Sequence, residues 1–208
     1  KDIISTYKKG TDFSIYMDTD GLIHAGSGLD QVTWMDVRVG DWVATPRHGK
    51  PVEINALWYN ALCTMDMLQA KFGDNDDSYR QLASLVKTSF NKRFWNENTG
   101  CLYDVVDEDD DTIRPNQIYA VSLPFTMLDK EREKAIVDTV MDKLYVGCGL
   151  RSLDPDHKDY HPIYIGSLSK RDHAYHQGTA WGFLLGGFIS AYAVSYTPLR
   201  AHETDSYL

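Results

Sequence analysis

Three long segments of this chain repeat apolar residues at helical spacing, and this pattern constrains the fold more than any other feature. It predicts a helix that begins at Pro51, carries Glu53 in its first turn and ends at Gly73. A second helix is predicted after the 74–77 cluster of Asp and Asn, which supplies N-cap residues, and a third over residues 129–145. The apolar positions are Ile54, Leu57, Trp58, Ala61, Met65, Leu68 and Phe72, then Tyr79, Leu82, Val86, Phe90 and Phe94, and finally Ile136, Val137, Val140, Met141 and Leu144.

The remaining segments predict shorter elements and long loops. A hairpin is expected over residues 12–26 and a turn-rich one over 95–113, with a short helix from Pro115 through Leu123. Loops are expected up to Lys50 and over residues 147–173. A last helix is predicted to begin near Gly178, and because it is apolar nearly all round, it is expected to be buried in a larger body. Helix pairs alternating with long polar and aromatic loops predict an all-α fold, an incomplete helical toroid whose site is built from loops at one end.

Charge and cysteine content limit the possible partners. The net charge of −9 disfavours nucleic acid or an anionic membrane as the main partner and suits a neutral polyol. Cys63, Cys101 and Cys148 show no paired spacing, which favours reduced thiols in the cytoplasm over disulfides or zinc. No apolar run reaches membrane-spanning length.

The two ends of the chain do not look like natural ends. The sequence begins on Lys1, without Met, in what resembles the end of a helix, and we interpret this start as a cut. The apolar pattern stops at Val194, and residues 195–208 resemble translated sequencing-adapter read-through. We therefore expect residues 1–194 to be one partial domain, cut at both ends, and residues 195–208 to be a non-native tail.

Two segments place acids beside aromatic and amide side chains, which is what a pyranose ring requires of its binding site. The first comprises Gln31–Asp36 and Arg47–Glu53, and the second is Arg171–Trp181. Asp36 is the leading candidate for a general acid, because the adjacent Trp34 and Met35 lower local polarity and so favour a protonated carboxyl group. The structural alternatives are that Asp36 caps a turn or pairs with Arg38.

Other residues of these segments are candidates for binding or for structure. Asp30 and Glu53 are rivals to Asp36, although Asp30 more simply caps a loop and Glu53 more simply stabilises its helix, with Arg47 as an ion-pair partner. We expect Trp34 to be exposed and Trp58 to be a core residue. The candidates for substrate binding are Trp34, Arg47, Glu53, Arg114, Asn116, Gln117, Arg151, Tyr175, His176, Gln177 and Trp181.

Metal sites are not favoured by the spacing of potential ligands. His173 and His176 are three residues apart, but no third ligand is placed near them. The acidic run Asp107–Asp111 lacks the glycine and ligand spacing of a calcium loop and is interpreted as a solvated loop.

At these residues the chain resembles the C-terminal amylo-α-1,6-glucosidase domain of glycogen debranching enzymes. The matching runs occur in family order over residues 10–193, and the ordered set is specific although each run alone is weak. They are Asp20-Gly21-Leu22-Ile23-His24-Ala25-Gly26, Thr33-Trp34-Met35-Asp36, Pro51-Val52-Glu53-Ile54-Asn55-Ala56-Leu57-Trp58-Tyr59-Asn60-Ala61-Leu62, Arg114-Pro115-Asn116-Gln117, Gly149-Leu150-Arg151-Ser152-Leu153 and Tyr175-His176-Gln177-Gly178-Thr179. One departure is Gly182, where many members carry Pro.

The resemblance implies a six-hairpin (α/α)₆ barrel and inverting hydrolysis of the α-1,6-linked glucose left at a trimmed branch point of glycogen or limit dextrin. It matches Asp36 to the general acid and implies no metal or organic cofactor. The family's general base is a Glu further along than Val194, so residues 1–208 alone are expected to be inactive. Two alternatives stay open: another inverting (α/α)₆ glycosidase of trehalase-like or glucoamylase-like type, and a non-catalytic glucan-binding module.

Overall fold

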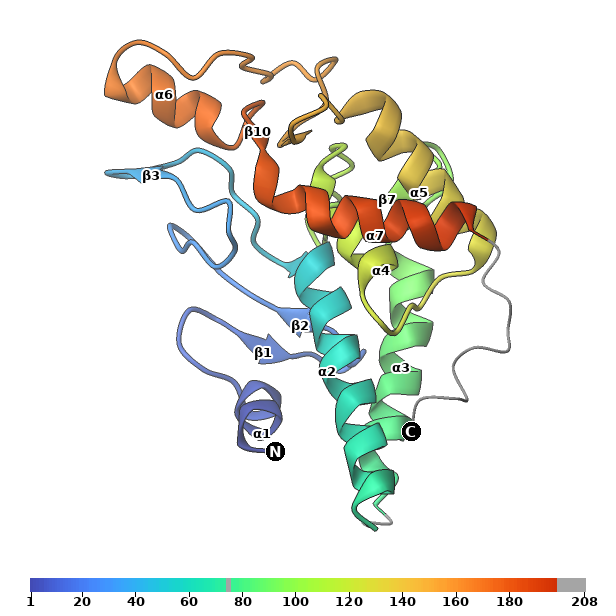
Figure 1. The fold of residues 1–208 in the computed structure, drawn as a ribbon. Helices are drawn as coiled ribbons and strands as arrows, with labels where there is room; N and C mark the ends of the chain where they lie inside the picture. Colours follow the sequence, from blue (N-terminus) through green and yellow to red (C-terminus); the bar gives the residue numbers. More distant parts are fainter. Residues whose placement is uncertain (74–75, 198–208) are drawn as a thin grey trace.

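The computed structural model describes residues 1–73 and 76–197, and within them the chain is mostly helical with small two-stranded sheets (Figure 1). This agrees with the all-α prediction, while the incomplete (α/α)₆ toroid stays a prediction. The helices are α1 (Asp2–Lys9), α2 (Val52–Lys71), α3 (Ser78–Arg93), α4 (Tyr119–Ser122), α5 (Lys130–Lys143), α6 (Leu168–Tyr175) and α7 (Leu185–Tyr196), with 3₁₀ turns η1 (Pro115–Ile118) and η2 (Gly182–Leu184). None of the described helices is both long and apolar enough to cross a lipid bilayer.

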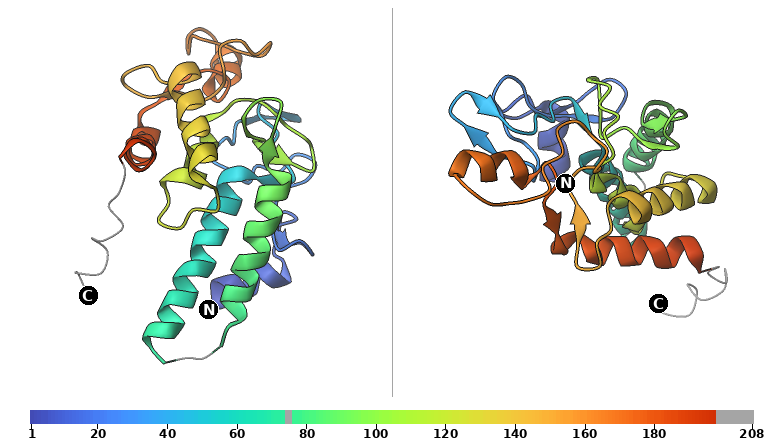
Figure 2. Two further views of the ribbon diagram at one scale, coloured as in Figure 1. Left: turned by 90° about the vertical axis from the view of Figure 1, so that its right-hand side faces the viewer. Right: turned by 90° about the horizontal axis from the view of Figure 1, so that it is seen from above.

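Helices α2 and α3 run antiparallel and pack along their length, as the views in Figures 1 and 2 agree. The predicted apolar face of α3 is buried there at Val86 and Phe90, and α2 contributes Trp58 and Leu62. Leu57, Ala61 and Phe72, which were predicted for the buried face of α2, are exposed. Helices α4, α5 and α7 pack together beside the upper end of this pair, where Ile136 and Phe188 join the same core. The helical periodicity is therefore confirmed as a core pattern for α3 and α5, whereas α2 buries a different set of residues from the one predicted.

The sheets are short antiparallel pairs of strands, which connect the loops by backbone hydrogen bonds. They pair β1 (Tyr16–Met17) with β2 (Ile23–His24), β3 (Arg38–Val39) with β4 (Trp42–Val43), β5 (Lys50–Pro51) with β8 (Val105–Val106), β6 (Trp95–Asn96) with β7 (Cys101–Leu102), and β9 (Leu150–Arg151) with β10 (Ala180–Trp181). The predicted hairpins over 12–26 and 95–113 are confirmed. The β5–β8 and β9–β10 ladders join segments far apart in sequence, which no local pattern predicts.

Several element boundaries differ from the prediction. Pro51 is the N-cap of α2 and not its first helical residue, because it pairs with Val105 in an extended conformation. The last helix begins at Leu185 and not near Gly178, since Trp181 is held in the β9–β10 ladder. Its expected burial on all sides is also wrong for this chain, in which Ile189 is 63% exposed.

The remaining differences concern the loops and the tail. Helix α6 lies largely within the predicted loop over 147–173. Helix α7 extends to Tyr196, two residues into the predicted non-native tail. The structure does not describe residues 198–208 of that tail. It also does not describe residues 74–75, which belong to the predicted N-cap cluster at 74–77.

Candidate functional site

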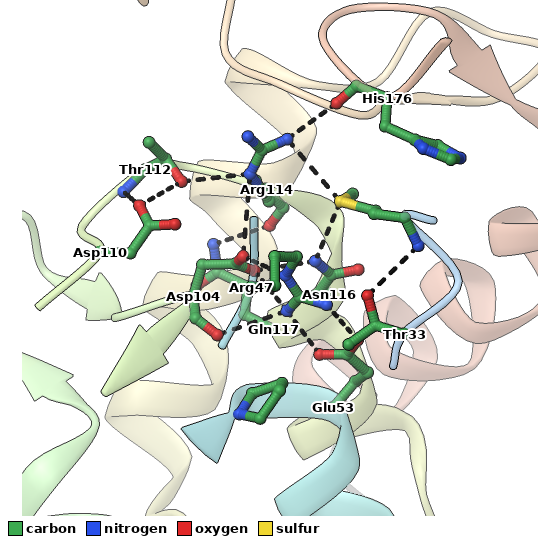
Figure 3. A network of polar contacts seen from close by, with 12 residues as sticks. Thr33, Arg47, Glu53, Asp104, Asp110, Thr112, Arg114, Asn116, Gln117 and His176 are labelled. Carbon is green, nitrogen blue, oxygen red and sulfur yellow. Dashed lines mark hydrogen bonds and ion pairs between the residues drawn. The ribbon is translucent and has the colours of Figure 1, made fainter. Parts of the chain in front are cut away.

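The candidate residues gather at one end of the molecule, around the N-terminal end of α2. The β3–β4 hairpin, α6 and β10 all lie at this end, whereas the α2–α3 connection lies at the other (Figure 1). These loops lie together at the end where the sequence analysis expects the site, which stays a prediction. A dense network of polar contacts lies beneath these loops (Figure 3).

Arg47 is the centre of this network. Its guanidinium group forms a bidentate ion pair with Glu53 in the first turn of α2, with Nη2 2.7 Å from Oε2. On its other side it donates from Nε and Nη2 to the carboxylate of Asp104, at 2.6 and 3.0 Å. All three residues are buried. Burial disfavours the charged form of Arg47, but the carboxylates of Asp104 and Glu53 outweigh this and raise its pKa. The interpretation of Glu53 as the partner of Arg47 is confirmed.

Asn116 connects this ion-pair network to the aromatic side chains. Its amide nitrogen donates to Oδ1 of Asp104 at 2.8 Å, and its amide oxygen accepts from Nε1 of Trp34 at 2.7 Å. Asn116 is fully buried. The hydrogen-bonding capacity of this amide is therefore directed at the protein itself, and it fixes the position of the Trp34 ring.

Arg114 joins the network to the second predicted segment. Its Nη1 donates to the backbone oxygens of Ser152 and His176, at 3.0 and 2.8 Å, and its Nη2 donates to Oε1 of Gln177 at 2.8 Å. Burial lowers the pKa of Arg114. Gln117 also serves the backbone, since its amide accepts from the amide of Leu102 and donates to the carbonyl of Arg114, each at 3.2 Å.

An aromatic cluster lies beside these residues. The ring of Trp34 meets those of His176, Trp181 and Phe183 edge to face, with centroids 5.1–5.6 Å apart. Tyr175 packs edge to face on Trp181 at 4.8 Å. Trp34, which was expected to be exposed, is half-buried because of these contacts, whereas Trp58 is buried in the core as expected. Edge-to-face packing orients the rings and leaves part of their surface accessible at the molecular end.

His176 lies at the junction of the cluster and the network. It is 1% exposed, and its Nδ1 atom has no hydrogen-bond partner among the described residues. Burial, together with the nearby charges of Arg114 and Arg47, lowers the pKa of His176 to about 4. The imidazole is therefore neutral at physiological pH.

The depressed pKa of His176 predicts a pH dependence of stability. The unfolded chain binds a proton at His176 near pH 6.5, whereas the folded chain resists doing so until about pH 4. We therefore expect this residue to lower the free energy of unfolding by up to about 3 kcal/mol as the pH falls from 6.5 to 4. Urea unfolding across this pH range should show a shallower decline for His176→Phe than for the wild type. His24→Asn should keep the full decline, and an unchanged decline in His176→Phe would contradict the assignment.

Asp36 differs from its neighbours in facing outward. Its side chain is exposed, whereas Met35 is buried with its sulfur 3.7 Å from Nη1 of Arg114. The two apolar neighbours that were expected to surround Asp36 therefore point into the protein and do not bury it. The alternative pairing with Arg38 is also not formed, because that guanidinium donates to the backbone oxygens of Gly40 and Leu29.

Two other candidates have structural partners. Asp30 caps a turn, accepting from the amide of Ser27 at 3.0 Å, as its structural interpretation predicted. Arg151 is half-buried in β9 and donates to the hydroxyl of Tyr160 at 3.0 Å. Within residues 1–73 and 76–197, no three His, Cys, Asp or Glu side chains come together as a metal site would require.

Asp104 is the main residue that the sequence reasoning missed. It contacts Arg47 and Asn116, and its carboxylate lies 3.7 Å from Arg114. A single polar residue within the apolar run Leu102–Val106 was the only local signal for it. The site thus combines an exposed carboxyl group, partly accessible aromatic rings and a buried polar network that holds Trp34.

Comparison with known proteins identifies the family of the chain. Residues 1–205 match the family described as Amylo-alpha-1,6-glucosidase, and the chain belongs to that family. A glycogen debranching enzyme of Saccharomyces cerevisiae is 29% identical over an alignment 233 positions long, gaps included, which covers 88% of this chain. The chain spans 15% of the length of that relative.

Proposed function

We propose that this member of the amylo-α-1,6-glucosidase family is part of a glycoside hydrolase that releases α-1,6-linked glucose from the branch stubs of glycogen or limit dextrin. The observation that carries the proposal is the family match over residues 1–205, which includes the run Thr33–Asp36. The exposed side chain of Asp36 supports it, because a general acid has to reach the glycosidic oxygen. The net charge of −9 suits a neutral glucan, and free Cys63, Cys101 and Cys148 suit a reducing cytoplasm.

In the proposed mechanism, Asp36 donates its proton to the oxygen that leaves C1 of the terminal glucose. A second carboxylate on the opposite face of the sugar removes a proton from a water, which attacks C1 with inversion. The two carboxyl groups need a separation of roughly 6.5–9.5 Å to admit that water. We assign the second carboxylate to no residue of the described chain.

The buried network has a positioning role in this proposal. Arg47, Glu53 and Asn116 were predicted to bind sugar hydroxyls, but each is buried and directed at another residue of the chain. They hold Trp34 and the start of α2, and through these elements they fix the segment that carries Asp36. Trp181 and Tyr175, which are only partly buried, are the proposed contacts to the glucose ring.

The linkage and stereochemistry of hydrolysis test this function. The enzyme that includes this chain is expected to release glucose from a limit dextrin that ends in single α-1,6 stubs, and to leave trehalose and linear maltooligosaccharides nearly untouched. Proton NMR should detect β-glucose first, before it equilibrates with the α anomer. Initial release of the α anomer would contradict inversion. Preference for trehalose or linear chains would favour the other glycosidases, and glucan binding without hydrolysis would favour a non-catalytic module.

A further inference from the structure

Met35 contacts the buried network directly, at the residue before Asp36. Its side chain is 2% exposed, whereas that of Asp36 faces outward. Its sulfur, the yellow atom in Figure 3, lies 3.7 Å from Nη1 of Arg114 and 3.8 Å from Nδ2 of Asn116. A thioether sulfur is a weak hydrogen-bond acceptor, so both nitrogens donate to Met35. An apolar side chain of the same size could fill this position but could not accept these bonds.

The side-chain amide of Asn116 contacts two consecutive residues of this segment. Its oxygen accepts from Nε1 of Trp34 at 2.7 Å. Its nitrogen donates to the sulfur of Met35 and, at 2.8 Å, to Oδ1 of Asp104. These contacts use both N–H groups of the amide as well as its oxygen. Because Asn116 is fully buried, an N–H group that loses its acceptor there is costly, and the position of Asn116 therefore depends on Met35.

Arg114 extends the contacts of Met35 to the second predicted segment. The Nη1 atom that faces the sulfur also donates to the backbone oxygens of Ser152 and His176, at 3.0 and 2.8 Å. On the other side of residue 35, the amide of Met35 donates to Oγ1 of Thr33 at 3.3 Å. Met35 is thus held at its side chain and at its backbone, and its position is coupled to the segment that carries the aromatic cluster.

The position of Met35 limits that of Asp36, because consecutive Cα atoms are about 3.8 Å apart. A general acid has to lie within hydrogen-bond reach of the glycosidic oxygen, and a displacement of about 1 Å can cost up to about 10²-fold in rate. We propose that Met35 is a positioning residue, because the contacts of its sulfur and its amide fix the position of Asp36. The proposal rests on the acid role proposed for Asp36 above.

Met35→Leu tests this role in the enzyme that includes this chain, because leucine nearly keeps the volume but accepts no hydrogen bond. We expect an unfolding midpoint near that of the wild type and a kcat on limit dextrin that is about tenfold lower, with KM changed by less than about twofold. Hydrolysis of α-glucosyl fluoride, which needs no acid, should stay within about twofold of the wild type. Met127→Leu is the matched control and should leave both rates unchanged, since Met127 is also 2% exposed but lies in the apolar core.

The double variant Met35→Leu with Asp36→Asn separates positioning from a general loss of structure. If Met35 acts through the acid, the double variant should hydrolyse limit dextrin as slowly as Asp36→Asn alone. Three results would overturn the positioning role and leave Asp36 as the acid: an unchanged kcat in Met35→Leu, an equal loss on both substrates, or an additive loss in the double variant. Near-normal turnover by Asp36→Asn would instead remove the proposed acid, and the positioning role with it.

A second variant decides the proposal if Met35→Leu does not fold. Thr33→Val removes the hydroxyl that accepts from the amide of Met35, at a half-buried side chain of nearly the same shape. It should lower kcat on limit dextrin about three- to fivefold and spare α-glucosyl fluoride, because one backbone contact of residue 35 is lost. An unchanged kcat on limit dextrin, or an equal loss on both substrates, would then contradict the positioning role.

Discussion

Replacing Asp36 with Asn is expected to reduce the rate of glucose release from limit dextrin by about 10²–10⁴-fold in the enzyme that includes this chain. The amide cannot donate an acidic proton to the leaving oxygen, while its size and hydrogen-bonding surface are nearly those of the acid. The loss should therefore appear in kcat, with a much smaller change in KM. Because Asp36 is exposed, we expect the substitution to leave the stability of the fold unchanged. An unfolding curve that matches that of the wild type would show that the loss of activity is not a folding defect.

A substrate that needs no proton sharpens this test. α-Glucosyl fluoride loses fluoride without help from an acid, so the Asp36→Asn variant should retain far more activity on it than on limit dextrin. Asp41→Asn provides the matched control, because Asp41 is an exposed aspartate in the turn of the same hairpin. Near-normal turnover of limit dextrin by Asp36→Asn, or an equal loss on both substrates, would remove Asp36 from the role of acid.

The parts of the fold that the sequence predicts are those in which local pattern and packing agree. Helices α3 and α5 were predicted because each buries one face with period 3.6. Helix α2 was predicted from the same period, but Leu57 and Phe72 of its predicted face are exposed. Helix α6 was missed because Ala174 is its one buried residue, so no apolar stripe marks it. Its only local signal is Ser167, whose side chain caps the amide of Lys170. The late start of α7 reflects the pairing of Trp181 with Leu150, a tertiary contact that overrides the apolar helical pattern.

In the candidate site, too, contacts between residues close in sequence could be predicted and long-range contacts could not. The pairing of Arg47 with Glu53 could be anticipated because the two residues are close in sequence, at the start of a predicted helix. Asp104 could not be found in this way, since it lies 57 residues from Arg47 and the β5–β8 ladder brings it close. The resemblance to a family predicted a set of polar site residues but not whether they contact substrate or each other. In the structure Arg47, Glu53 and Asn116 contact each other or Asp104.

The central position of Asp104 predicts a large loss of stability when it is replaced by Ala. Asp104 accepts hydrogen bonds from Arg47 and Asn116 and faces Arg114, all within the buried interior. Its removal leaves the donors of Arg47 and Asn116 without their acceptor. Arg47 then keeps only the carboxylate of Glu53, and Arg114 loses the carboxylate that faces it. We expect the free energy of unfolding, measured by urea titration, to fall by about 3–5 kcal/mol.

An exposed aspartate gives the comparison that isolates the effect of burial. Asp138 pairs with Lys134 at 2.6 Å, a geometry as close as that of Asp104 with Arg47, but the two side chains are 46% and 51% exposed. Asp138→Ala should therefore change the free energy of unfolding by less than about 1 kcal/mol. Equal effects of the two substitutions would mean that the buried network does not hold this end of the molecule together. In that case Trp34 and the segment that carries Asp36 would have to be positioned by the aromatic cluster alone.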